Sequence, residues 1–157
     1  MKKCTKTIIF FISLFLLLVG CSTTTVSKEA LDEKTIPLPK VVTEETVIPV
    51  KQSSYCWGIL GCGDYVGGKA MLNEETPTVV APEAKIKVSF DYEPAPSQVA
   101  VQQYIDEETV DVPLKEGYFM APKDKGIYYY GISAFWTSED GKYSKGDTSS
   151  VFLIEVK

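Results

Sequence analysis

The chain has 157 residues, 45% of them hydrophobic, and its formal net charge at pH 7 is −5. It contains no histidine and no arginine, so the usual general base near neutral pH, the commonest zinc ligand and the bidentate clamp for phosphate are missing. The acidic balance disfavours nucleic acid and anionic lipid as main partners, since both attract clustered positive charge. We therefore expect one packed domain that is not an enzyme and holds no metal or cofactor.

The first 20 residues predict a secretory signal peptide. Lys2, Lys3 and Lys6 precede an apolar run over residues 8–19, which only Ser13 interrupts. The run is too short to cross a bilayer as a helix, because that takes roughly 20 residues. Removing this segment would leave 13 lysines against 21 acidic residues, a net charge of −8.

The apolar run ends in Leu18-Val19-Gly20-Cys21, which resembles the lipobox of bacterial lipoproteins. The resemblance implies cleavage before Cys21, acylation of its sulfur with two chains, and a lipid anchor on the extracytoplasmic face of the cell membrane. Two acyl chains hold a protein on a bilayer, whereas one chain binds it only reversibly. The alternative is an ordinary cleaved signal peptide in which Cys21 has no special role.

Residues 21–54 are predicted to be the lipidated N-terminus and a polar tether. Short apolar pieces there alternate with acidic residues and with Pro37, Pro39 and Pro49. A flexible tether of about 33 residues would have an end-to-end distance of roughly 30 Å. The alternative is that residues 40–50 pack on the domain as an extended edge.

Residues 55–76 are rich in glycine and contain the two cysteines that would remain available after lipidation, Cys56 and Cys62. The glycines between positions 58 and 68 disfavour a helix and indicate tight turns. In an exported protein the two cysteines can form a disulfide, which we expect to stabilise the fold by about 2 kcal/mol. A metal or redox site is the alternative, although such cysteine pairs normally have two intervening residues.

The ring closed by this disulfide would hold Trp57, Ile59 and Leu60. So small a ring cannot bury three large apolar side chains within itself. Either these side chains cap one end of the core, or they form a contact surface for a partner or for a membrane.

Residues 77–157 are predicted to form the folded domain. Alternation of apolar and polar residues marks short strands, and turns with proline or glycine separate them. The predicted strands cover 77–80, 85–92, 99–105, 110–114, 118–120, 127–137 and 151–156. Six or seven short strands without a helical segment favour an all-β, antiparallel sandwich. The runs 126–136 and 152–156 resemble the last strands of immunoglobulin-like bacterial surface domains, and this resemblance implies an immunoglobulin-like fold.

The longest predicted strand presents aromatic residues on both of its faces. Tyr128 and Tyr130 are expected to face the core, whereas Tyr129 and Phe135 lie on the opposite face. That second face is either a binding patch, on which a carbohydrate could stack, or it is covered by residues 40–76.

Acidic residues are weak candidates for a catalytic site or a calcium site. Glu107, Glu108 and Asp111 could form a pair of carboxylates, but acids in a polar turn are normally a solvated surface. Two predicted loops, 138–141 and 146–147, offer oxygen ligands for calcium but lack the regular ligand spacing of known calcium loops.

We expect from these observations a lipid-anchored, non-catalytic binding module or envelope accessory module. Its partners would be the membrane, through the lipid on Cys21, and an envelope protein or a cell-wall polymer. One alternative is an inhibitor or immunity-type lipoprotein that blocks a cationic hydrolase or toxin. A second alternative is a calcium-binding surface protein.

Overall fold

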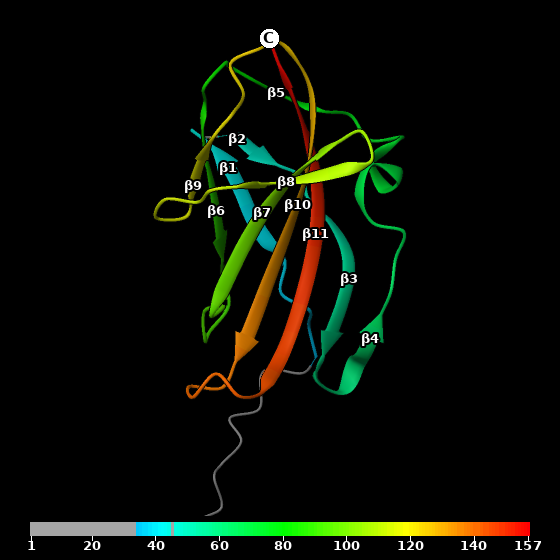
Figure 1. Cartoon of the computed structure of the whole chain (residues 1–157), viewed down its shortest axis with the longest axis vertical. Coiled ribbons are helices and arrows are strands. Elements are labelled where there is room, and N and C mark those ends of the chain that lie inside the picture. Colours follow the sequence, from blue (N-terminus) through cyan, green and yellow to red (C-terminus); the bar gives the residue numbers. More distant parts are fainter. Residues whose placement is uncertain (1–33, 45) are drawn as a thin grey trace, which may run out of the picture.

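Two antiparallel sheets pack against each other in the computed structural model, which describes residues 34–44 and 46–157 (Figure 1). The smaller sheet has the strand order β2 (Thr46–Ile48), β1 (Pro39–Thr43), β6 (Lys85–Phe90) and β9 (Tyr118–Met120). The larger sheet has the order β4 (Gly61–Gly63), β3 (Lys51–Trp57), β11 (Ser144–Val156), β10 (Gly126–Thr137), β7 (Gln98–Ile105) and β8 (Glu108–Val112). Its seventh strand, β5 (Thr78–Val80), pairs with β11 in parallel. Two short 3-10 helices are η1 (Gly58–Leu60) and η2 (Gly68–Leu72). The predicted all-β sandwich is therefore confirmed.

The core lies between the two sheets and follows the alternation of the strands. In β6, Ile86 and Val88 are buried while Lys85 and Lys87 are exposed, as the sequence pattern predicts. The main cluster comprises Val41, Ile48, Val80, Ile86, Val88, Val101, Phe119, Ala121, Tyr130, Ile132, Phe152, Ile154 and Val156. Both sheets contribute to it, so burial of their facing apolar surfaces holds the two layers together.

A second, aromatic cluster closes the end of the sandwich where β10 ends. Trp136 and Trp57 are each 1% exposed, and their ring centroids lie 4.9 Å apart in an edge-to-face arrangement. Phe90 and Tyr92 also meet Trp136 edge-on, at 5.6 and 5.7 Å. The indole N–H of Trp136 donates a hydrogen bond of 2.7 Å to the carbonyl oxygen of Pro94, which satisfies the one polar atom of this buried side chain.

The sandwich begins earlier in the chain than the sequence predicted. β1, β2 and much of β3 lie within residues 39–54, which were expected to be part of a tether. Val41 and Ile48 are each 1% exposed, because β1 pairs with β6 and places these side chains on the inner face of the smaller sheet. The tether prediction is wrong for this segment, and the alternative of packing by residues 40–50 describes it better. Residues 21–33 of the expected tether lie outside the described residues.

The last strand also begins earlier than predicted. β11 starts at Ser144, and the expected loop at 146–147 lies inside it, between β10 and β3. Gly146 serves close packing there rather than a turn, because a Cβ atom at this position would lie 2.6 Å from the ring of Trp57. The reversal predicted at 140–141 is confirmed, since it forms the turn between β10 and β11.

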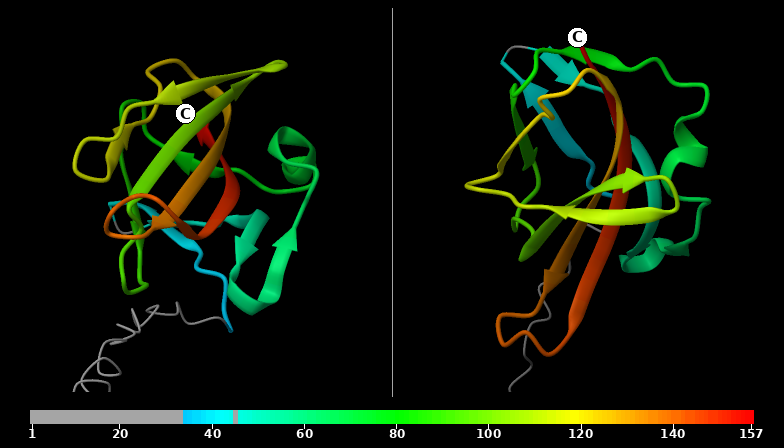
Figure 2. Two further views of the ribbon diagram at one scale, coloured as in Figure 1. Left: turned by 60° about the horizontal axis from the view of Figure 1, so that its bottom comes forward. Right: turned by 45° about the horizontal axis from the view of Figure 1, so that its top comes forward.

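The described chain enters the sandwich at the end where the β3–β4 and β10–β11 turns lie, and we name this the entry end (Figures 1 and 2). Pro39, the first residue of β1, pairs with Phe90, the last residue of β6. Trp57, the last residue of β3, pairs with Gly146 near the start of β11. The C-terminus lies at the opposite end, where β11 finishes.

Candidate functional site

β3, η1 and β4 form a hairpin at the entry end, and a disulfide joins its two strands. Cys56 and Cys62 are direct partners in the β3–β4 register and are bonded to each other. Gly58 and Gly61 have φ angles of 45° and 70°, a conformation that glycine adopts without steric cost. The two glycines therefore reverse the chain within the ring, and the disulfide fixes the position of the turn between them.

This turn separates the three apolar side chains that were predicted as one contact surface. Trp57 is buried in the aromatic cluster, so its assignment to the surface is wrong, because the pleat of β3 directs it to the core. Ile59 is 74% exposed and Leu60 is 43% exposed. Trp57 thus caps the core, as the first alternative predicted, whereas Ile59 and Leu60 stay a predicted contact surface.

Ser54 of β3 holds the chain that follows the hairpin. Its hydroxyl donates a hydrogen bond of 2.8 Å to the Asp64 carboxylate and accepts one of 3.0 Å from the backbone N–H of Tyr65. Tyr65 and Val66 are 51% and 76% exposed, and the sequence reasoning did not single them out. Their place directly after the Gly63-Asp64 turn signal could have identified them as surface residues.

The second face of β10 is partly covered. η2 packs over Tyr129: Leu72 lies in a buried cluster against which the tyrosine packs, and the Lys69 ammonium lies 5.6 Å from the centroid of its ring. For Tyr129 the structure thus agrees with the covered alternative, in which residues 40–76 shield this face. Phe135, by contrast, is 38% exposed and lies on the surface as expected.

A hollow of about 340 Å³ lies beside η2. Leu72 of η2 and Val151 and Leu153 of β11 give it an apolar floor, while Lys51 and Glu75 at its lining form an ion pair with each other. The sequence reasoning did not anticipate this hollow, because its walls come from three segments that are distant in the chain.

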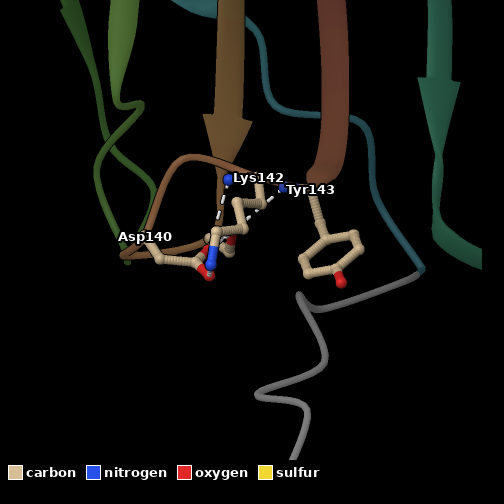
Figure 3. A network of polar contacts seen from close by, with 4 residues as sticks. Asp140, Lys142 and Tyr143 are labelled. Atoms are coloured by element: carbon tan, nitrogen blue, oxygen red, sulfur yellow. Dashed lines mark hydrogen bonds and ion pairs between the residues drawn. The ribbon is translucent and has the colours of Figure 1, made fainter.

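A polar network around Asp140 holds the β10–β11 turn (Figure 3). The Ser138 hydroxyl donates a hydrogen bond of 2.6 Å to one carboxylate oxygen of Asp140, and the backbone N–H of Lys142 donates one of 3.2 Å to the same oxygen. These bonds, the one from Ser138 first, lower the pKa of Asp140 because they favour its charged form. The Lys142 ammonium lies 3.3 Å from the other carboxylate oxygen. The network therefore fixes an exposed turn whose last residue, Tyr143, is 69% exposed.

The same network bears on the calcium alternative. Both oxygens of Asp140 are engaged by groups of their own turn, and Asp147 lies within β11 opposite Phe135 rather than in a second loop. Within residues 34–44 and 46–157, no group of three or more cysteine, aspartate and glutamate side chains is arranged to hold a metal ion. The acidic side chains of the described residues thus give the calcium alternative no support.

The acidic residues near the β7–β8 turn lie on the surface. Glu107 and Glu108 are exposed, and the carboxylate of exposed Asp111 accepts a hydrogen bond of 3.0 Å from the Gln102 amide across the two strands. This arrangement fits the solvated face that acidic residues in a polar turn normally form.

The chain matches none of the protein-family models, curated proteins or solved structures with which it was compared. The described part of the chain also has no helix with the length and hydropathy needed to cross a membrane. The fold therefore defines the class, an all-β sandwich, and any function has to be argued from the chain's own residues.

Proposed function

We propose that this chain is a bacterial lipoprotein anchored to the extracytoplasmic face of the cell membrane through Cys21. Its β-sandwich acts as a non-catalytic binding module or envelope accessory module. The observation that carries the proposal is the sequence Leu18-Val19-Gly20-Cys21 at the end of the apolar run, where a lipobox belongs.

The disulfide between Cys56 and Cys62 supports an extracytoplasmic site of action. Disulfides persist in oxidising compartments outside the cytoplasm and are rare within it. With these two cysteines joined and Cys4 inside the signal peptide, Cys21 is the one cysteine of the expected mature chain left for acylation.

Exposed apolar side chains support a binding role for the sandwich. Tyr65 and Val66 are exposed on the chain that follows the disulfide hairpin, and Phe135 is exposed on β10. Such groups contribute binding energy when a partner covers them, and an envelope protein or a cell-wall polymer is the class of partner available at this location.

Metabolic labelling with a palmitate analogue tests the anchor. We expect the wild-type chain to be labelled and Cys21→Ser to be unlabelled, because the thioether cannot form without the thiol. Cys4→Ser is the matched control and should keep the label, since residue 4 leaves with the signal peptide. Label retained by Cys21→Ser, or wild-type chain recovered from the cytosol with Met1 attached, would refute the proposal.

A further inference from the structure

We propose that the turn of the disulfide hairpin, Ile59-Leu60, and Tyr143 of the neighbouring β10–β11 turn rest on the bilayer that carries the lipid anchor. The inference rests on the proposed function, because a bilayer is held beside this sandwich only if Cys21 is acylated. The occupant of the surface is the interfacial layer of the phospholipid bilayer, between the headgroups and the acyl chains.

The first argument is the length of chain between the anchor and the sandwich. Twelve residues, 22–33, lie between Cys21 and Lys34, the first described residue. This stretch can span at most about 47 Å, whereas the tether of about 33 residues expected from the sequence could have spanned about 120 Å. Since the described chain starts at the entry end, the link keeps that end of the sandwich within about 47 Å of the anchor, close enough to reach the membrane.

The second argument is the composition of the hairpin turn. Ile59 and Leu60 are exposed, and no charged residue occurs between Lys51 and Asp64. An uncharged turn can enter the interface without the cost of removing an ion from water. The disulfide keeps both side chains at the tip of a fixed hairpin, away from the core of their own domain.

The third argument is the position of Tyr143. It is 69% exposed, and its ring points away from the strands (Figure 3). Tyrosine favours the membrane interface because its ring is apolar and its hydroxyl is polar. Asp140 and Lys142 of the same turn pair with each other, whereas Glu139 is exposed and stays in water at the headgroup level in this arrangement. The pairing of Gly146 with Trp57 joins this turn to the hairpin. Two neighbouring turns therefore offer two points of contact with one surface.

The test uses the acylated full-length mature chain, reconstituted into phosphatidylcholine vesicles with and without lipids brominated on their acyl chains. Tryptophan is introduced as Ile59→Trp in the hairpin turn or as Ile127→Trp near the opposite end, two positions that are 74% and 50% exposed. Both variants retain Trp57 and Trp136, and the emission of the wild-type chain gives the background that these two residues contribute.

We expect brominated lipid to quench the added emission of Ile59→Trp at least about twofold more than that of Ile127→Trp, because apolar side chains in the interface are buried roughly 5–10 Å into the boundary between headgroups and acyl chains. Equal quenching of the two variants, on chains whose mass shows the acyl groups, would overturn this inference alone and leave the turn for a protein partner. A mature chain without acyl mass on Cys21 would overturn the anchor and this inference together.

Discussion

At the scale of single residues, Gly146 shows how close packing selects an amino acid. The ring of Trp57 lies against β11 at this position, where a Cβ atom would be 2.6 Å from the nearest ring carbon. At Gly131 the corresponding contact, 2.4 Å, is with the hydroxyl at the far end of the Tyr104 side chain, which is only partly buried. Glycine inside a strand often marks such a close approach. Gly146 therefore matters more than Gly131, because the ring beside it is locked in the aromatic cluster.

Gly146→Ala should lower the free energy of unfolding by about 1–3 kcal/mol, the usual cost of overpacking, because Trp57 is held against Trp136 and cannot yield. Gly67→Ala is the matched control: the nearest atom to its added Cβ is the Ser53 hydroxyl oxygen at 3.8 Å, so the change should stay below about 1 kcal/mol. Urea unfolding followed by tryptophan fluorescence measures both. Equal losses in the two variants would contradict the packing account.

At the scale of elements, β1 and β2 complete the smaller sheet. β1 pairs with β6 along its full length, and β2 pairs with β1 on the other side. Without them, the sheet would consist of β6 and β9, and the main core would lose Val41 and Ile48. β6 would then have a free edge, and part of the apolar inner face of the larger sheet would be uncovered. These strands are therefore a structural part of the domain.

Two adjacent residues of β2 test this assignment. Ile48 is 1% exposed and Val47 is 60% exposed, because successive side chains of a strand point to opposite faces. Ile48→Ala should destabilise the chain by about 2–5 kcal/mol, whereas Val47→Ala should change stability by no more than about 0.5 kcal/mol. Thermal or urea unfolding distinguishes the two. A tether would instead tolerate both substitutions equally.

At the scale of the whole molecule, the sandwich is one unit built from both ends of the described chain. β11 pairs with β10, β3 and β5, and β6 pairs with β1 and β9. The segment 77–157, expected from the sequence to be the complete domain, contains seven of the eleven strands. It lacks the partners that cover β6 on one side and β11 along its first half.

We expect residues 77–157 alone to show no cooperative unfolding transition, whereas residues 34–157 should unfold cooperatively. Truncation removes Val41, Ile48 and Trp57 from the core, and the loss of a few such side chains, at about 2–5 kcal/mol each, equals the stability of a typical domain. Thermal scans by circular dichroism compare the two chains. A sharp transition in the shorter one would show that the N-terminal strands are dispensable.

Features that depend on local pattern could be predicted from the sequence. Alternation over 85–92 and 127–137 located two strands and assigned their inner faces correctly, because the pleat of a strand has a period of two residues. Glycine and aspartate at 140–141 located a reversal. The small number of cysteines made Cys56 and Cys62 candidate partners, and the structure shows that they are bonded. The lipid anchor and the binding role stay predictions.

Which segments become partners across the sandwich depends on the three-dimensional fold and could not be predicted from local pattern. Thr46–Ile48 is too short to show a period, and it forms a strand because β1 lies beside it. Trp57 and Ile59 are both apolar and two positions apart, yet one is buried and the other is exposed, because the chain turns between them. Pairing between segments distant in the chain is energetically decisive but leaves little trace in the local pattern of either segment.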